Sequence, residues 1–313
     1  MGIQVNSDNF VRAETDRMFG DIQRDAGGVN RLKHNRVPAP VDQQTVIRMN
    51  RDTLYSFAIV NLRSGATLTL PDAAGRYLSA MVVNNDHLIP TIYHDAGNYA
   101  LTESAVGSQF AMIGVRILVD PNDAADVAEV CALQDRIAIT AGASAEFDRP
   151  DYDVASLTKT RDALLSLASG LRSFDHMFGT RDQIDPVRHL IGTAAGWGGL
   201  PTTEAAYVGV QPDVDGNSTL TLKDVPVDAF WSISVYNEQG YFEPNDDGVY
   251  TINSVTATPN PDGSHTVRFV TGQLTEPNSI PVPPKWNYLV RLYRPRASFF
   301  DGSWQLPKAV PTS

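Results

Sequence analysis

Short apolar runs rich in Val, Ile, Tyr and Thr recur along most of the chain, and clusters of Gly, Pro, Asn and Asp separate them. Runs of this length and composition are typical of β-strands. Polar and apolar residues roughly alternate in Tyr250–Val255 and His265–Val270, which indicates a sheet with one face toward water. The predicted strands are Tyr55–Leu62, Thr67–Leu70, Tyr77–Asn84, Phe110–Val119, Thr219–Leu222, Phe230–Tyr236, Val249–Val255, His265–Val270 and Tyr288–Tyr293.

Helical periodicity is concentrated in two places, around Asn9–Ile22 and in a central block from Asp123 to Ala195. Within the block, Asp153 precedes a stripe of leucines and is a candidate N-cap. Asp185 stands before Pro186, which places a capping carboxylate ahead of a proline at the first helical position. The order of elements is therefore strands, helices, strands.

An internal repeat refines this picture. Thr67–Asn84 (TLTLPDAAGRYLSAMVVN) and Thr219–Asn237 (TLTLKDVPVDAFWSISVYN) share TLTL, an Asp, an aromatic residue, a Ser, a Val and the final Asn. Two weaker echoes follow in the same order, Gly97–Thr102 with Gly248–Asn253 and Val115–Ile117 with Val290–Leu292. The three echoes together predict two copies of one β-sandwich, each burying its own sheet faces.

The sequence thus predicts a mainly β protein with helical insertions, built from two tandem antiparallel β-sandwich domains that are jelly-roll-like. The predicted segments are an N-terminal helical segment over 1–44, a first sandwich over 45–121, a helical connecting block over 122–205 and a second sandwich over 206–313.

Composition excludes several classes of protein. The 313 residues are 42% hydrophobic and include 12 Phe, 11 Tyr and 4 Trp, so the chain can bury a core and is not intrinsically disordered. No apolar run reaches the roughly 18–20 residues that a membrane helix requires. The first ten residues lack the basic-then-apolar pattern of a signal peptide, so we expect a cytoplasmic protein with no membrane partner.

Charge and motifs narrow the partners further. The net charge of -11 opposes binding to a nucleic-acid backbone. Cys131 is the only cysteine, so the chain forms no intramolecular disulfide and lacks the thiolates of a Cys-based zinc site. The sequence contains no GxSxG, HExxH, P-loop or GxGxxG motif. We therefore expect a small-molecule partner and neither a metal nor a cofactor; a homo-oligomer is compatible with the sequence.

Two polar clusters flank predicted strands. Asn50, Arg51 and Asp52 precede the strand that begins at Tyr55, where the Arg and Asp can turn inward as a hydrogen-bonded pair. Such a pair either fixes the fold or forms part of a site. We expect both side chains to lie largely out of water.

Asp86 and His87 follow another strand, and Pro90 marks its end. An imidazole beside a carboxylate is typical of general acid–base catalysis, while the plainer interpretation is a loop that bonds to backbone or water. We expect His87 in a concave pocket, with Asp86 or Asp52 as its carboxylate partner.

Aromatic and amide side chains at Trp231, Tyr236 and Asn237 are candidates for the wall and the polar contacts of a pocket. The alternative is that these aromatic residues form the sandwich core.

Several strings resemble one bacterial family: VIRMNRDTLYS (46–56), PDAAGRYLSAMVVNNDH (71–87), LIGTAAGWGG (190–199), VPVDAFWSISVYNEQGYF (225–242) and WNYLVRLYRPR (286–296). The family pairs two domains of unknown function, numbered 1254 at the N-terminus and 1214 at the C-terminus. The resemblance implies tandem β-sandwich domains with helices between them, and no settled activity. Many relatives begin with an export signal, which this chain lacks.

The leading functional hypothesis is a small-molecule enzyme, a hydrolase or lyase that uses general acid–base chemistry. Arg51 would hold an anionic or carbonyl oxygen, Asp52 would orient it, and His87 with Asp86 would move the proton. The substrate-binding residues would be Asn50, Tyr55, Trp231, Tyr236 and Asn237. The alternative is a non-catalytic protein that binds a carbohydrate or other small ligand on exposed Trp231 and Trp286.

Overall fold

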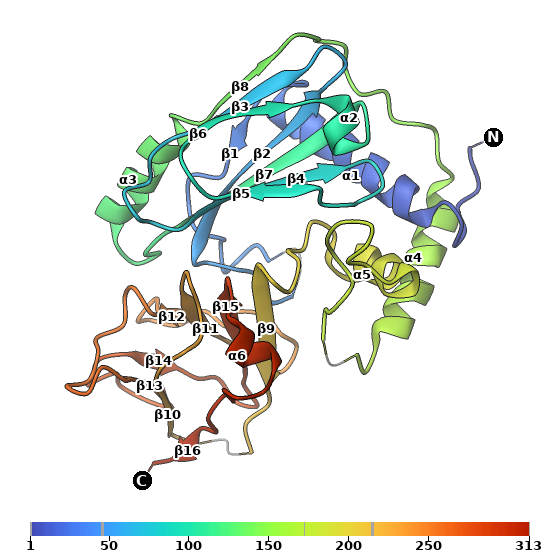
Figure 1. The fold of residues 1–313 in the computed structure, drawn as a ribbon. Coiled ribbons are helices and arrows are strands. Elements are labelled where there is room, and N and C mark those ends of the chain that lie inside the picture. The colour runs from blue at the N-terminus through green and yellow to red at the C-terminus, as the bar shows by residue number, and fades with distance from the viewer. Residues whose placement is uncertain (1, 45–46, 172, 214–215, 313) are drawn as a thin grey trace. The chain divides into compact units, whose positions relative to one another are not determined.

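The computed structural model describes residues 2–44, 47–171, 173–213 and 216–312. The described part is mainly β, with strands in four sheets and no closed barrel, and this confirms the predicted sandwich class. The chain divides into two compact units (Figure 1). Unit 1 comprises 1–36, 54–118 and 128–202, and unit 2 comprises 37–53, 119–127 and 203–313.

Unit 1 contains a five-stranded and a three-stranded sheet. The first has the order β1 (Lys33–His34), β2 (Thr53–Asn61), β7 (Phe110–Leu118), β4 (Leu78–Asn84) and β5 (Thr91–Tyr93). The second has the order β6 (Gly97–Leu101), β3 (Ala66–Leu70) and β8 (Ala138–Ala141). Every residue of β4 is buried, which fits a strand at the centre of the unit.

Three helices of unit 1 pack against one another: α1 (Phe10–Ala26), α4 (Val154–Ala168) and α5 (Pro186–Gly196). The carboxylate of Asp153 accepts a hydrogen bond from the Ser156 amide and caps α4, and Asp185 caps α5 in the same way. Both caps confirm the sequence prediction. The shorter helices of the chain are α2 (Glu103–Val106), α3 (Ala124–Gln134) and α6 (Ala297–Phe300). No helix in the described part is long and apolar enough to cross a membrane.

Unit 2 is a sandwich of two four-stranded sheets. One has the order β12 (Thr251–Asn253), β11 (Trp231–Tyr236), β15 (Asn287–Tyr293) and β9 (Ala205–Val210). The other has the order β14 (Ser279–Pro281), β13 (His265–Val270), β10 (Ser218–Leu222) and β16 (Val310–Pro311). Neighbouring strands are antiparallel except β13 and β14, which are parallel.

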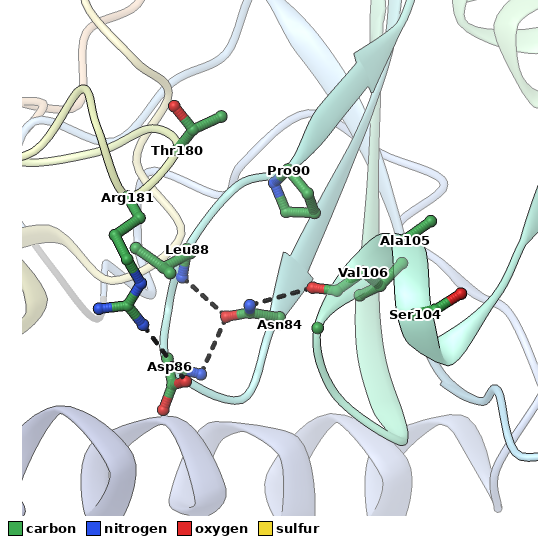
Figure 2. A pocket seen from close by; sticks show the side chains of 10 residues that line it. Asn84, Asp86, Leu88, Pro90, Ser104, Ala105, Val106, Thr180 and Arg181 are labelled. Atoms are coloured by element: carbon green, nitrogen blue, oxygen red, sulfur yellow. Dashed lines mark hydrogen bonds and ion pairs between the residues drawn. The ribbon is translucent and has the colours of Figure 1, made fainter.

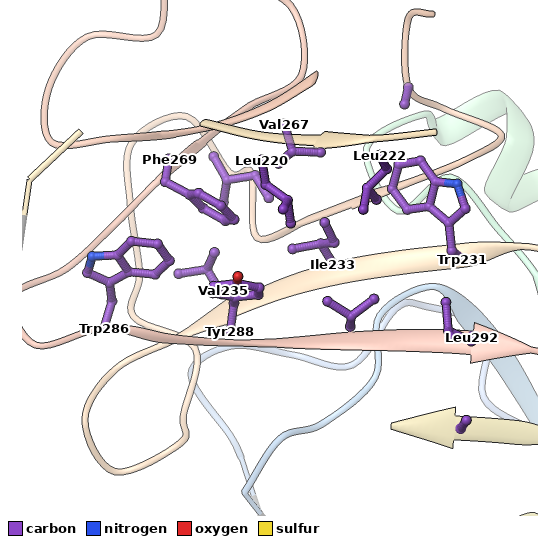
Figure 3. Close-up of a cluster of buried hydrophobic side chains, with 14 residues drawn as sticks. Leu220, Leu222, Trp231, Ile233, Val235, Val267, Phe269, Trp286, Tyr288 and Leu292 are labelled. Atoms are coloured by element: carbon purple, nitrogen blue, oxygen red, sulfur yellow. The ribbon is translucent and has the colours of Figure 1, made fainter. Parts of the chain in front are cut away.

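Alternate residues of both sheets form the core of unit 2. Trp231, Ile233 and Val235 of β11 meet Leu220 and Leu222 of β10 across the sandwich (Figure 3). Because strand side chains alternate between faces, Ser232, Ser234 and Tyr236 point to the opposite face of the β12–β11–β15–β9 sheet. We call that opposite face the polar face of unit 2.

The structure supports the internal repeat through its strand pairing. β3 pairs with β6 and β8 in unit 1, and β10 pairs with β13 and β16 in unit 2. β4 lies between β5 and β7, and β11 lies between β12 and β15. The third echo also matches, because Arg116 stands opposite Ser79 and Arg291 stands opposite Ser232.

The second echo is wrong. Gly97–Thr102 contains β6, which pairs with β3, whereas Gly248–Asn253 contains β12, which pairs with β11. The pairing makes β5 the equivalent of β12 and β6 the equivalent of β13. Short strings such as G-x-Y are common at strand starts, so similarity alone aligned strands that belong to different sheets.

Two short segments cover equivalent places in the two units. Residues 47–52 lead into β2 but belong to unit 2, and residues 197–202 lead into β9 but belong to unit 1. Arg116 donates to the Gly198 carbonyl at 2.9 Å, and Arg291 donates to the Arg48 carbonyl at 2.9 Å. The units therefore differ from the four segments predicted by sequence, because each takes up a segment that precedes a strand of the other.

Two strands were missed by sequence patterning. β8 lies inside the predicted helical block, and β9 lies at the boundary of the predicted second sandwich. β8 is an edge strand whose residues are only partly buried, so it lacks the apolar run that marks an interior strand.

Candidate functional site

The predicted site residues lie in both units. Tyr55, Asp86 and His87 belong to unit 1, and Asn50, Arg51, Asp52, Trp231, Tyr236 and Asn237 belong to unit 2. Each group is described within its own unit.

The Asp86–His87 loop of unit 1 is built on Asn84. The side-chain oxygen of Asn84 accepts hydrogen bonds from the amides of Asp86 and Leu88, at 2.9 Å and 3.0 Å. In unit 2, Asn237 holds the amides of Gln239 and Tyr241 in the same way. Asn84 and Asn237 are therefore turn-forming residues common to both repeats, and Asn237 also bonds to Glu243.

His87 occupies a left-handed backbone position, with φ of 58°, and the equivalent residue in unit 2 is Gly240 with φ of 89°. Left-handed backbone is unfavourable for a residue with a Cβ and is freely adopted by glycine. The surroundings of the His87 side chain must therefore offset the strain of this position.

Those surroundings enclose the ring completely, since His87 is 0% exposed. Nδ1 lies 2.8 Å from the Thr193 hydroxyl, which itself donates to the His189 carbonyl, and Nε2 accepts from the Gly198 amide at 2.9 Å. This pattern fits a neutral ring that carries its proton on Nδ1. Burial, together with the nearby His189, holds the pKa of His87 well below its usual value.

His87 is also the centre of an aromatic stack. Its ring lies parallel to Trp197, with ring centroids 5.2 Å apart, and 5.3 Å from His189 on stacked planes. The expected carboxylate partner is absent: among the described residues, neither ring nitrogen bonds to Asp86 or to any other acid. The reason is geometric, because the turn on Asn84 directs the two neighbouring side chains to different surroundings.

Asp86 points to the surface instead. Its carboxylate pairs with Arg12 at 2.5 Å and lies 3.9 Å from Arg181. It lines a pocket of about 310 Å³, together with Asn84 and residues of α2 (Figure 2). His87 is not among the residues that line this pocket, so its predicted concave setting is wrong.

Tyr55 lies on β2 within unit 1. The guanidinium of Arg116 sits over its ring at 5.4 Å, and Phe57 stacks beside it at 5.7 Å. In unit 2 the residue opposite Arg291 on β9 is Tyr207. A tyrosine beside the buried arginine is thus another feature of both repeats.

Arg291 organises the polar face of unit 2 and is only 2% exposed. Nη1 donates to the Ser234 hydroxyl, and Nη2 donates to the Tyr236 hydroxyl, both at 2.7 Å. The Tyr236 hydroxyl in turn donates to the Met49 carbonyl. Burial by itself lowers the pKa of Arg291, but Tyr236, Tyr293 and Asp52 raise it by more, so the guanidinium stays charged.

A relay of hydroxyl groups joins this cation to Asp52. Ser234 donates to Thr251 at 3.2 Å, and the Thr251 hydroxyl donates to Oδ1 of Asp52 at 2.9 Å. Asn253 approaches the same oxygen at 3.3 Å. Every donor in the relay points from the guanidinium toward the carboxylate, so the buried charges are balanced without direct contact.

The second oxygen of Asp52 differs from the first. Asp52 is 0% exposed, which confirms the expected burial, and Oδ2 meets no hydrogen-bond partner in the described part of the chain. The carboxylate is anchored at one oxygen only. A buried, unbonded carboxylate oxygen is costly, so it is typical of a group that acts on a bound molecule.

Arg51 and Ser232 add two further buried polar atoms of this kind. Arg51 lies over the Tyr250 ring at 5.1 Å and donates to the Ala39 carbonyl, but its Nε finds no acceptor among residues that the structure describes. Burial lowers the pKa of Arg51. The hydroxyl of Ser232 is likewise unbonded within the described ranges. Ser232 stands opposite both Asn253 and Arg291 in the sheet.

Asn50 and Trp231 have other roles. The Asn50 side chain donates to Tyr293 and to Thr53, and its oxygen accepts from the Asp52 amide, so it shapes the turn that presents Asp52. Trp231 is 3% exposed and belongs to the core (Figure 3). Trp286 is 1% exposed in the same core, so the expected aromatic platform on the surface is wrong. These rings are needed to fill the space between the two sheets.

The comparisons with known proteins agree with the two-part architecture. Residues 29–141 match the model of "Protein of unknown function (DUF1254)", and residues 201–297 match that of "Protein of unknown function (DUF1214)". The chain belongs to the family that pairs these two domains. A search of curated proteins returned no match.

Two solved structures resemble this DUF1254–DUF1214 chain in fold. The VPA0106 protein from Vibrio parahaemolyticus has a TM-score of 0.73 at 16% identity, with 98% of each chain covered. A putative uncharacterized protein from Burkholderia cenocepacia has a TM-score of 0.52 at 13% identity, with 92% of this chain and 83% of that one covered. At these identities the likeness shows the fold alone.

The polar face of unit 2 combines both family domains. Asp52 lies in the DUF1254 match, while Thr251, Asn253 and Arg291 lie in the DUF1214 match. These three residues and Ser232 and Ser234 were missed as site residues by sequence reasoning. The Val-Arg-Leu echo was the one available indication of Arg291, because it marked an arginine inside an apolar strand.

The repeat separates shared architecture from features of one copy. Ser79 and Arg116 in unit 1 match Ser232 and Arg291 in unit 2. By contrast, Met81 and Ile92 face each other where unit 2 has Ser234 and Thr251. The hydroxyl relay to Asp52 is therefore specific to unit 2. No group of three or more His, Cys, Asp or Glu side chains in the described ranges is arranged to hold a metal ion.

Proposed function

We propose that the chain is a small-molecule enzyme of the hydrolase or lyase type and that Asp52 is its general acid–base. The observation that carries the proposal is the buried Oδ2 of Asp52, which no described residue contacts by a hydrogen bond. The relay fixes the other oxygen, so the carboxylate is oriented before a substrate binds. Asp52 then takes a proton from a hydroxyl, a water or an acidic carbon and returns it to the leaving group.

The cations around Asp52 support this role. The positive charge of Arg291 reaches Asp52 through Ser234 and Thr251 and stabilises the carboxylate when it is charged. Nε of Arg51 is a free donor for an anionic or carbonyl oxygen of the substrate. Unit 1 carries the same fold without the relay, so the fold itself does not require these polar groups.

The proposal moves the proton-transfer role from His87 to Asp52. Both ring nitrogens of His87 are engaged within unit 1, and its pKa is held far below neutrality by burial. A group in this state neither gains nor releases a proton readily at neutral pH. His87 is better explained as a residue that holds the 197–202 segment against unit 1.

The test is turnover of ester, amide, lactone and carboxylic-acid panels by the full chain and by Asp52→Asn. Asn keeps the size of the side chain and can still accept from Thr251, but it does not transfer protons. We expect turnover to fall by roughly 10²–10⁴-fold, the usual share of a general acid–base. Thermal unfolding of the variant checks that the fold is retained.

Asp86→Asn is the matched control, because it makes the same chemical change at a half-exposed ion pair. It should leave turnover nearly unchanged. Full activity in Asp52→Asn, or an equal loss in Asp86→Asn, overturns the proposal. Ligand binding without turnover of any panel member supports the alternative, a non-catalytic binding protein for small ligands.

A further inference from the structure

We infer that the substrate of the polar face is a short carboxylic acid that carries a hydroxyl or amino group close to its carboxylate. The inference rests on the proposed function and adds the chemical class of the ligand. It follows from which hydrogen-bonding atoms the site leaves free and from the charge that surrounds them.

The free atoms gather around one strand. Asp52 bonds to Thr251 and Asn253 of β12, and Arg51 lies over Tyr250, the residue before that strand. Ser232 stands opposite Asn253 on the neighbouring strand. The unbonded atoms of these three residues therefore lie around the same four positions, 250–253.

Two of the free atoms are donors and one is an acceptor. Nε of Arg51 and the hydroxyl of Ser232 donate, while Oδ2 of Asp52 accepts; in the described part of the chain none has a partner. A complementary ligand presents acceptor oxygens to the two donors and a hydroxyl or amino hydrogen to Asp52. A carboxylate beside a hydroxyl-bearing or amino-bearing carbon supplies this set.

Charge selects the same class. Arg51 and Arg291 contribute two positive charges and Asp52 contributes one negative charge, so a single negative charge on the ligand neutralises the cluster. A second carboxylate would meet Asp52 and be repelled. A neutral ligand would leave the Arg51 guanidinium buried and uncompensated.

The experiment measures binding of matched probes to the full chain by calorimetry: lactate, propionate, which lacks the hydroxyl, and lactamide, which lacks the charge. We expect lactate to bind about tenfold or more tightly than either analogue, because each analogue leaves one buried group unpaired. Equal binding of the three probes, or no binding of lactate and of its amino counterpart alanine, overturns the inference.

A pair of serine variants tests the placement of the ligand. Ser232→Ala removes a hydroxyl that no described residue uses, so it should weaken lactate binding while the fold stays intact. Ser79→Ala makes the same change at the equivalent position of unit 1, whose hydroxyl is also buried without a described partner, and should leave lactate binding unchanged. Equal effects of the two variants contradict the site.

The two proposals fail in different ways. If Asp52→Asn abolishes turnover of another panel member while lactate binds no better than propionate, only the substrate class is wrong. If lactate binds selectively and Asp52→Asn turns over substrate like the unchanged protein, the acid–base proposal is wrong and the ligand class stands.

Discussion

At the scale of single residues, the repeat distinguishes residues that build the fold from those that belong to one copy. His87 has glycine as its counterpart, and it adopts backbone that a histidine enters only at a free-energy penalty. Its contacts with Thr193, Gly198 and Trp197 explain how that penalty is offset. The histidine is therefore an internal support of unit 1.

The buried imidazole makes the stability of the protein depend on pH. The pKa of His87 is lowered in the folded state, so the unfolded chain binds a proton first, near its ordinary value of about 6.5. The contribution of His87 is complete above that pH, and stability falls as the pH drops below it. Between about pH 6.5 and pH 5 we expect a loss of up to about 2 kcal/mol from this group.

Urea unfolding at both pH values measures this loss, with His87→Gln as the comparison. Gln does not titrate, so the variant should be less stable at neutral pH but lose less stability on acidification. The carboxylates of the chain titrate in both proteins and cancel in the difference. Parallel pH profiles for the two proteins would contradict the assignment.

At the scale of elements, helix α5 links local capping to this buried cluster. Asp185 accepts from the amides of Val187 and Arg188, and Pro186 occupies the first turn. The helix then presents Thr193 to His87 and His189 to the Met177 carbonyl. The start of α5 thus fixes the height at which the ring stack forms.

Removal of the cap should be felt in stability. Asp185→Ala leaves two amides at the start of α5 without their acceptor, and we expect the free energy of unfolding to fall by about 1 kcal/mol. Asp182→Ala is the control, because that carboxylate is exposed and bonds to the Thr180 hydroxyl rather than to a helix start. Denaturant midpoints compare the two variants; an equal effect would show that α5 does not depend on its cap.

At the scale of the whole molecule, two repeats use one arginine for the same task. Arg116 binds the Gly198 carbonyl and Arg291 binds the Arg48 carbonyl, so each buried cation holds a chain segment against its own sheet. The neighbouring amides are held as well, by His87 in unit 1 and by the Gly240 carbonyl in unit 2. The pairing of segment to sheet is an architectural element of both units.

Replacement of each arginine should release its own segment. In Arg291→Met, the Arg48 amide should exchange with solvent faster, because the carbonyls of 48 and 49 lose their donor while Gly240 remains. In Arg116→Met, the Gly198 amide should exchange faster instead. Hydrogen exchange followed residue by residue measures both, and each variant is the control for the other. Acceleration of the same amides in both variants would contradict separate roles.

The sequence by itself determined the strands of the interior, the capped helices and the existence of a repeat, because these depend on local backbone preference and on side-chain periodicity. Asp153 and Asp185 act as caps wherever the helices pack, and the Val-Arg-Leu echo marks the same strand position in both units. Family membership follows from the same local strings.

Only the tertiary structure decided which polar residues meet. Asp52 finds its partners Thr251 and Asn253 about two hundred positions away, and His87 finds Thr193 in a helix rather than the acid beside it. Adjacent residues in a turn diverge, and a strand offers its polar side to whatever segment covers the sheet. The covering segment is chosen by long-range strand order, and no local pattern in the chain encodes that choice.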